Sequence, residues 1–283
     1  MNLPYQPDFS NDVAVVTGAG GVLCSMFAQA LVLCGAKVVL LDHTEANVRT
    51  VERELRALGG EVLGVVADVT DANSLLHARD EMLAAFGPCT ILLNGAGGNK
   101  PSATTDDEFF QPGETPAAGT KSFFDLDPTG FDEVFGLNLK GTLLPTQVFA
   151  RKMAQHGGGR ILNISSMNAF TPLTRIPAYS AAKAAVSNFT RWLAVYFSQS
   201  GVRVNAIAPG FFSTRQNTKL LWNEDGTPTP RTLKILKSTP LGRFGEPEEL
   251  LGAMLFLLDD KAASFVTGVV LAVDGGFSAY AGV

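Results

Sequence analysis

Cysteine and histidine are scarce in this chain of 283 residues, with three of each. The cysteines, Cys24, Cys34 and Cys89, form no CxxC pair, which argues against a disulfide framework and against a zinc site. Cys24 and Cys34 fall in an apolar, helix-like stretch, so we expect buried thiols there. The histidines are scattered and indicate no metal-binding cluster: His43, His77 and His156.

Basic and membrane-directed segments are also lacking. The formal net charge is −5, and this mildly acidic balance gives no electrostatic reason to expect nucleic acid or an anionic membrane as a partner. No hydrophobic run approaches the length of a membrane span. The N-terminal segment contains Pro4, Pro7 and Asp8 in place of an apolar signal-peptide core, so we expect a cytoplasmic protein.

Apolar residues, in contrast, make up 46% of the chain, enough for one sizeable core. Short β-branched runs alternate with amphipathic segments, and this alternation predicts strands separated by helices. The first three predicted helices are 22–34, 44–58 and 71–86. The predicted strands are 13–17, 37–41, 61–67, 90–93, 160–164, 202–207 and 269–273. Uniformly apolar strands of this kind predict an α/β fold, a doubly wound, Rossmann-like parallel sheet in one domain spanning 1–283. Two insertions rich in proline and polar residues, 97–124 and 214–240, follow strand ends on the expected substrate side.

A glycine-rich turn, Gly18–Gly21, joins the first strand to the first helix. This order places a pyrophosphate at a helix N-terminus, where free N–H groups favour negative charge. Asp42 ends the second strand, where it can accept hydrogen bonds from the adenosine ribose and repel a 2′-phosphate, which favours NAD over NADP. Taken alone, the turn can be an ordinary loop and Asp42 a helix cap. Asp68 can touch the adenine or serve as a turn residue.

Tyr179 and Lys183 lie four residues apart in a strongly helix-forming stretch, so they share one helical face. A tyrosine titrates near pH 10, but a nearby ammonium and an oxidised nicotinamide would stabilise its phenolate. Tyr179 is therefore a candidate acid and base. Ser166 follows a predicted strand and can donate a hydrogen bond to a substrate oxygen. Asn138 is polar in an apolar helix and can bind a water that links Lys183 to solvent.

Taken together, these residues resemble the classical short-chain dehydrogenase/reductase family over nearly the whole chain. The matching motifs are Thr17-Gly18, Asp68-Val69, Asn94-Gly95-Ala96-Gly97, Asn138, Ser166, Tyr179 with Lys183, Asn205 and Pro209-Gly210-Phe211-Phe212-Ser213-Thr214. The resemblance implies an NAD(H)-dependent oxidoreductase with a Ser-Tyr-Lys mechanism and Asn138 in the proton relay. It also implies a homotetramer, with the apolar stretch 269–277 as a subunit contact.

The same resemblance implies a set of cofactor contacts. The expected cofactor-binding residues are Gly18, Gly20, Gly21, Val22, Leu23, Asp42, Asp68, Val69, Asn94, Gly95, Ala96, Tyr179, Lys183, Pro209, Gly210, Phe212 and Thr214. Thr214 and the backbone after Pro209-Gly210 would hold the nicotinamide carboxamide. The family usually has glycine at positions 22 and 24 and asparagine at 95, where this protein has Val22, Cys24 and Gly95.

A narrower resemblance links the sequence to the D-mannonate oxidoreductases of the short-chain type, also called fructuronate reductases. It is carried by GGVLC, KSFFDLDPTGF, SSMNAFTPLTRIPAYS, NAIAPGFFSTRQN and VDGGFSAYAGV. The implied reaction is D-fructuronate plus NADH to D-mannonate. The candidate substrate residues are Lys100, Asn168, Arg175 and Arg215. Each of them can also be an ordinary loop residue. The guanidinium groups of the two arginines can bind a carboxylate.

Two other functions stay open. One is a gluconate 5-dehydrogenase-like enzyme, or another sugar or polyol dehydrogenase. The other is a nucleotide-sensing protein without catalysis, because a Rossmann fold alone does not define a function. The presence of Ser166, Tyr179, Lys183 and Asn138 together favours an enzyme.

Overall fold

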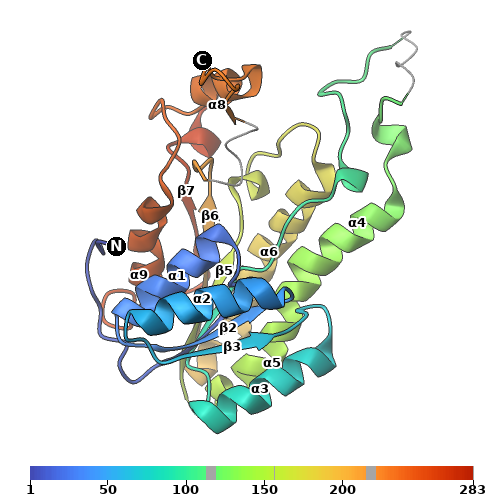
Figure 1. Cartoon of the computed structure of the whole chain (residues 1–283). Helices are drawn as coiled ribbons and strands as arrows, with labels where there is room; N and C mark the ends of the chain where they lie inside the picture. The colour runs from blue at the N-terminus through green and yellow to red at the C-terminus, as the bar shows by residue number, and fades with distance from the viewer. Residues whose placement is uncertain (113–118, 156, 215–220, 283) are drawn as a thin grey trace.

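A computed structural model of the protein describes residues 1–112, 119–155, 157–214 and 221–282. Its strands form one parallel sheet in the order β3-β2-β1-β4-β5-β6-β7 (Figure 1), which confirms the predicted doubly wound, Rossmann-like fold. The order reverses between β1 and β4, and open α/β sheets bind ligands at the carboxyl ends beside such a reversal. The strands are β1 (Val13–Thr17), β2 (Lys37–Asp42), β3 (Val62–Val66), β4 (Ile91–Asn94), β5 (Gly159–Ile164), β6 (Val202–Pro209) and β7 (Val270–Val273).

Helices cover both faces of the sheet (Figure 1). On one face lie α1 (Val22–Leu33), α2 (Glu45–Ala57) and α9 (Leu251–Leu258), and on the other lie α3 (Ala72–Ala85), α5 (Gly141–Gln155) and α6 (Pro177–Tyr196). In β2, Val38 and Leu40 pack toward α1, whereas Val39 and Leu41 pack toward α3 and α5. Because both faces are buried, the strands are continuous apolar runs without polar alternation. Within the described ranges, no helix is both long and apolar enough to cross a membrane.

The predicted helix limits agree with the structure because local signals define them. Gly35 follows α1 with a φ of +91° and ends the helix, as expected for a residue without a Cβ. The side chain of Asp71 accepts the N–H of Asn73 at 2.9 Å and caps α3. Short 3-10 turns lie outside the sheet layers at Met167–Ala169, Ser198–Ser200, Pro247–Leu250 and Phe277–Ala279.

The described parts of both insertions lie at the carboxyl end of the sheet, the upper edge in Figure 1. The first contains 3-10 turns at Pro101–Ala103 and Phe123–Asp125 and leads into α4 (Pro128–Phe135). The expectation of a long loop at 214–240 is wrong for its second half, which forms α8 (Pro230–Ser238). Proline at the first helical position and a threonine cap before it start this helix, a signal that the composition of the segment obscured.

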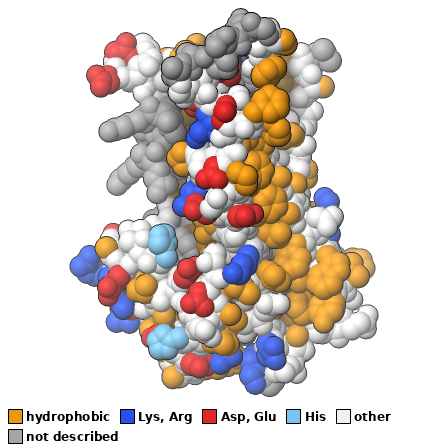
Figure 2. All heavy atoms as spheres, turned by 90° about the vertical axis from the view of Figure 1, so that its right-hand side faces the viewer, with side chains coloured by type: hydrophobic (Ala, Val, Ile, Leu, Met, Phe, Trp, Pro, Cys, Tyr) orange, Lys and Arg blue, Asp and Glu red, His pale blue; other side chains and the backbone are white. Residues whose placement is uncertain are grey.

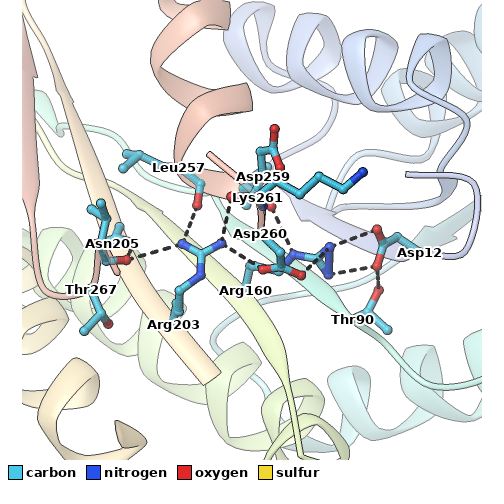
Figure 3. A network of polar contacts seen from close by, with 12 residues as sticks. Asp12, Thr90, Arg160, Arg203, Asn205, Leu257, Asp259, Asp260, Lys261 and Thr267 are labelled. Atoms are coloured by element: carbon cyan, nitrogen blue, oxygen red, sulfur yellow. Dashed lines mark hydrogen bonds and ion pairs between the residues drawn. The ribbon is translucent and has the colours of Figure 1, made fainter. Parts of the chain in front are cut away.

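A buried polar network closes the opposite, amino-terminal edge of the sheet (Figure 3). Arg160 of β5 binds both carboxylate oxygens of Asp12 at 2.8 and 3.0 Å and donates to the Leu258 carbonyl at 3.0 Å. Its guanidinium also lies 3.1 Å from Asp260, which pairs with Arg203 of β6 at 3.0 Å. The network therefore joins the starts of three strands to the end of α9, far from the glycine turn.

Candidate active site

A cleft of about 530 Å³ opens at the carboxyl ends of the strands, beside the reversal of strand order. Most of the expected cofactor residues line it: Gly18, Gly20, Gly21, Val22, Leu23, Asp42, Gly95, Ala96, Tyr179, Pro209, Gly210, Phe212 and Thr214. Ser166 lines it as well. Gly97 and Phe211 of the predicted motifs also line it, and further wall residues that were not expected lie within or beside the motifs: Cys24, His43, Asn47, Leu137, Ile164 and Ser165.

Four expected cofactor residues do not line the cleft. Asn94 lies within the sheet, where its amide donates to Asn163 at 2.9 Å and to Thr146 at 3.1 Å. Asp68 is exposed and accepts hydrogen bonds within its own turn. Val69 is buried, and Lys183 lies behind the wall, 4% exposed. Asn94, Val69 and Lys183 are thus buried residues away from the wall and Asp68 an exposed turn residue, a distinction that a motif match does not make.

The glycine turn presents backbone donors to the cleft. Gly18 has a φ of +66°, and a Cβ there would lie 2.8 Å from the Cα of Ala96, so the turn requires glycine. Gly21 caps α1, and in the described part of the chain the N–H groups of Val22 and Leu23 have no acceptor. These donors at a helix N-terminus fit a pyrophosphate, and Val22 leaves them available.

Cys24 and Gly95 replace two usual family residues, and the structure makes these replacements complementary. The Cys24 thiol is buried between α1 and the end of β4, and a Cβ on Gly95 would overlap its Sγ. That same Cβ would also lie 3.1 Å from the carbonyl oxygen of Thr17. The thiol fills the space that a side chain at position 95 would need, so each residue depends on the other.

Gly95→Ala is expected to lower the free energy of unfolding by about 1–3 kcal/mol, because the new methyl group must displace Cys24 and the first turn of α1. Cys24→Ala removes the obstructing sulfur. Gly95→Ala combined with Cys24→Ala should therefore lose less stability than the two single changes added together. Urea unfolding measures all three variants. A Gly95→Ala protein as stable as the wild type would contradict the overlap.

Asp42 holds the turn from the neighbouring strand. One carboxylate oxygen accepts the Gly20 N–H and the other accepts the Thr44 N–H, each at 3.0 Å. The carboxylate is 7% exposed and lines the cleft. Among the described residues of the cleft wall there is no lysine or arginine. Both features are unfavourable for a 2′-phosphate and favour NAD.

Two of the predicted chemical groups, Ser166 and Tyr179, line the cleft wall, and Lys183 lies behind them. Burial raises the pKa of the Tyr179 phenol above its ordinary value, and the Ser166 hydroxyl lowers it by a smaller amount. Lys183 lies on the same helix, with Nζ 5.6 Å from the centre of the Tyr179 ring and 2.8 Å from the Ile164 carbonyl. Burial lowers the pKa of Lys183 from 10.5 to about 8. Among the protein's own groups burial dominates the pKa of the phenol, and the expected stabilisation of the phenolate by Lys183 together with an oxidised nicotinamide stays a prediction.

Asn138 joins this group through an irregular helix turn. It lies in a π-helical turn, Gly136–Lys140, between α4 and α5, and such turns often mark functional sites. Its side chain is fully buried, donates to the Gly98 carbonyl at 2.8 Å and accepts the Gly98 N–H at 3.2 Å. A Cβ on Gly97 would lie 2.7 Å from Asn138 Oδ1 and 3.1 Å from Lys183 Nζ. The two polar groups therefore flank the same glycine.

The expected substrate residues are dispersed. Lys100 pairs with Glu133 at 3.3 Å. Asn168 is 4% exposed, and its Oδ1 has no partner in the described part of the chain. Arg175, with a φ of +74°, donates from Nε to the Thr105 carbonyl at 3.0 Å. Arg215 lies outside the described residues.

The protein belongs to the short-chain dehydrogenase family, whose sequence profile matches residues 12–225, and this confirms the predicted family. An uncharacterized oxidoreductase of Haemophilus influenzae is 54% identical over 285 residues, which cover 100% of this chain and 99% of the relative. The uncharacterized oxidoreductase UxuB of Bacillus subtilis is 48% identical over 281 residues, which cover 99% of this chain and 100% of the relative.

Solved structures agree with this relationship. A crystal structure from H. influenzae, provisionally named a D-mannonate oxidoreductase and containing bound NAD, superposes with a TM-score of 0.95 at 54% identity over 98% of each chain. A gluconate 5-dehydrogenase from Burkholderia cenocepacia, solved with NADP and tartrate, superposes with a TM-score of 0.81 at 30% identity over 97% of each chain.

Proposed function

We propose that the protein is an NAD(H)-dependent reductase of a hexuronate, most specifically of D-fructuronate to D-mannonate. The observation that carries the proposal is the placement of Ser166 and Tyr179 on the wall of a cleft that also contains Asp42 and the open N-terminus of α1. The provisional name and the bound NAD of the 54% identical structure support the substrate and the cofactor.

In the proposed mechanism, each polar group has one task. The nicotinamide, when bound, supplies the hydride that goes to the carbonyl carbon. Tyr179 donates its hydroxyl proton to the carbonyl oxygen, and Ser166 holds that oxygen by a hydrogen bond. Burial keeps the phenol protonated at neutral pH, which is the form that reduction needs. Lys183 stabilises the phenolate that remains, and Asn138 connects Lys183 to the source of the next proton.

The test is NADH consumption with D-fructuronate, run beside D-tagaturonate, 5-ketogluconate and uncharged ketoses, with NADPH as the alternative cofactor. We expect the highest kcat/KM with D-fructuronate and NADH. The best activity with 5-ketogluconate would favour the gluconate 5-dehydrogenase alternative, which the structural likeness to such an enzyme supports. An absence of turnover with every carbonyl compound would leave a nucleotide-sensing role.

The pKa of Lys183 sets the expected pH dependence. Because that pKa is about 8 and the pKa of Tyr179 is raised, Lys183 is the first of the two groups to lose its proton as the pH rises. We expect kcat/KM for reduction to fall above pH 8 as the ammonium charge disappears. In Lys183→Arg, whose guanidinium stays charged, the alkaline limb should move to higher pH even if kcat is lower. An unchanged limb in this variant would assign it to another group.

We also propose that the protein works in the cytoplasm as a homotetramer. The three cysteines are free and buried, which suits a reducing compartment. Figure 2 shows hydrophobic side chains in a band along one face, and the exposed large hydrophobic residues of α6 include a stacked pair, Trp192 and Tyr196, with ring centres 4.9 Å apart. Exposed apolar surface of this kind is typical of a subunit contact. Light scattering tests the tetramer, and a monomeric mass would reject it.

A further inference from the structure

A second hollow, of about 150 Å³, lies next to the cofactor cleft and shares Phe211 with it as a wall. Leu173 and Thr174 form another side of the hollow and belong to the segment between Ser166 and Tyr179. The helix α8 provides the side opposite, through residues at i, i+3, i+4 and i+7 that share one helical face: Arg231, Lys234, Ile235 and Ser238. The hollow is therefore within reach of a molecule held at the catalytic groups.

The charges around this hollow are unbalanced. Glu108 of the first insertion is its one carboxylate among the described lining residues, and both oxygens lie 2.9 Å from Lys234 Nζ. The hydrogen bond from Lys234 and the positive charges of Lys234, Arg175 and Arg231 lower the pKa of Glu108. Two cations, Lys234 and Arg231, thus line the hollow with one carboxylate, and the charge of Arg175 also acts on that carboxylate, in a protein whose net charge is −5.

Arg231 is the cation without an assigned partner. In the described part of the chain its guanidinium has no hydrogen bond and no ion pair. It also lies in the first turn of α8, where the helix dipole disfavours positive charge. Its position therefore does not stabilise the helix. A guanidinium can bind a carboxylate through two parallel hydrogen bonds, which suits an anionic ligand in the hollow.

We propose that Arg231 binds the carboxylate of the sugar-acid substrate, with Arg175, whose charge also acts on Glu108, as a second source of positive potential. This inference rests on the proposed function and adds the residue that selects an acid over a neutral sugar. Lys234 is engaged in its ion pair with Glu108, so Arg231 is the cation of the hollow that remains to bind the substrate. Phe211 lines both the hollow and the cleft, so the proposal places the carboxylate in the hollow and the keto group at the neighbouring cleft wall, which Tyr179 lines.

The test compares D-fructuronate with D-fructose, which has a CH₂OH group in place of the carboxylate. In Arg231→Met we expect KM for D-fructuronate to rise by about tenfold or more, with a smaller change in kcat, while kcat/KM for D-fructose stays as in the wild type. Arg231→Lys keeps the charge without the paired donors, so its KM for D-fructuronate should lie between those of the wild type and Arg231→Met. The control is Lys237→Met, an exposed lysine of the same helix outside the hollow, which should change nothing.

NADH affinity and circular dichroism establish that each variant is folded. If the wild type reduces D-fructuronate but Arg231→Met and Lys237→Met have the same KM, the inference is wrong and the proposed function survives. If the wild type does not reduce D-fructuronate, the proposed function fails first. The inference is then decided by calorimetric titration of D-mannonate into the protein with NAD⁺: wild-type binding that Arg231→Met loses supports it, and equal binding or none overturns it.

Discussion

Tyr179→Phe is expected to reduce kcat for carbonyl reduction by about 10²–10⁴-fold, the range that a positioned acid contributes. The phenylalanine ring keeps the packing of Tyr179 against α4 but has no proton to give to the carbonyl oxygen. Ser166 and the cleft remain, so NADH should bind with nearly unchanged affinity. Stopped-flow measurement of hydride transfer separates chemistry from binding and from product release.

The matched control is Tyr280→Phe, which makes the same change at an exposed position that does not line the cleft. Its kcat should equal that of the wild type. If Tyr179→Phe keeps full activity, Tyr179 has no part in proton transfer. If it loses NADH binding together with activity, the tyrosine holds the cofactor and the loss of kcat does not assign an acid.

The fold could be predicted in detail because its signals are local. The apolar run of β2 and the glycine that follows α1 each specify an element from a few neighbouring residues. Tyr179 and Lys183 were predictable for the same reason, since four residues in a helix place two side chains on one face. The pKa of Tyr179 was not predictable, because burial depends on distant segments that cover it.

The parts that could not be predicted are contacts between distant segments. Cys24 and Gly95 each look like a loss of a family residue, and only their proximity across the turn shows that they fit one another. Arg231 was also missed, because the threonine and proline that begin α8 lie in a segment that looked like a loop. The proposed role of Arg231 depends on its position near Glu108, which lies more than a hundred residues earlier in the sequence.

Arg160→Met is expected to lower the free energy of unfolding by about 3–5 kcal/mol, the usual effect of removing one partner from a buried ion pair. The change leaves the Asp12 carboxylate, 11% exposed, with the Thr90 hydroxyl as its remaining side-chain donor (Figure 3). It also removes the donor to the Leu258 carbonyl. Arg53→Met is the control, because Arg53 is exposed and lies outside this network.

The pH dependence of this loss distinguishes an unpaired charge from a packing defect. Burial already raises the pKa of Asp12 above its ordinary value in spite of Arg160, so removal of the guanidinium should raise it further. A carboxyl group with a raised pKa in the folded state stabilises the protein at low pH, and this contribution disappears as the pH rises through that pKa. The deficit of Arg160→Met should therefore be smaller at pH 5 than at pH 8, and Asp12→Asn combined with Arg160→Met should recover part of it. A deficit that is equal at both pH values would indicate lost packing alone. In either case kcat of the folded protein should stay unchanged, because the network closes the edge of the sheet opposite the cleft.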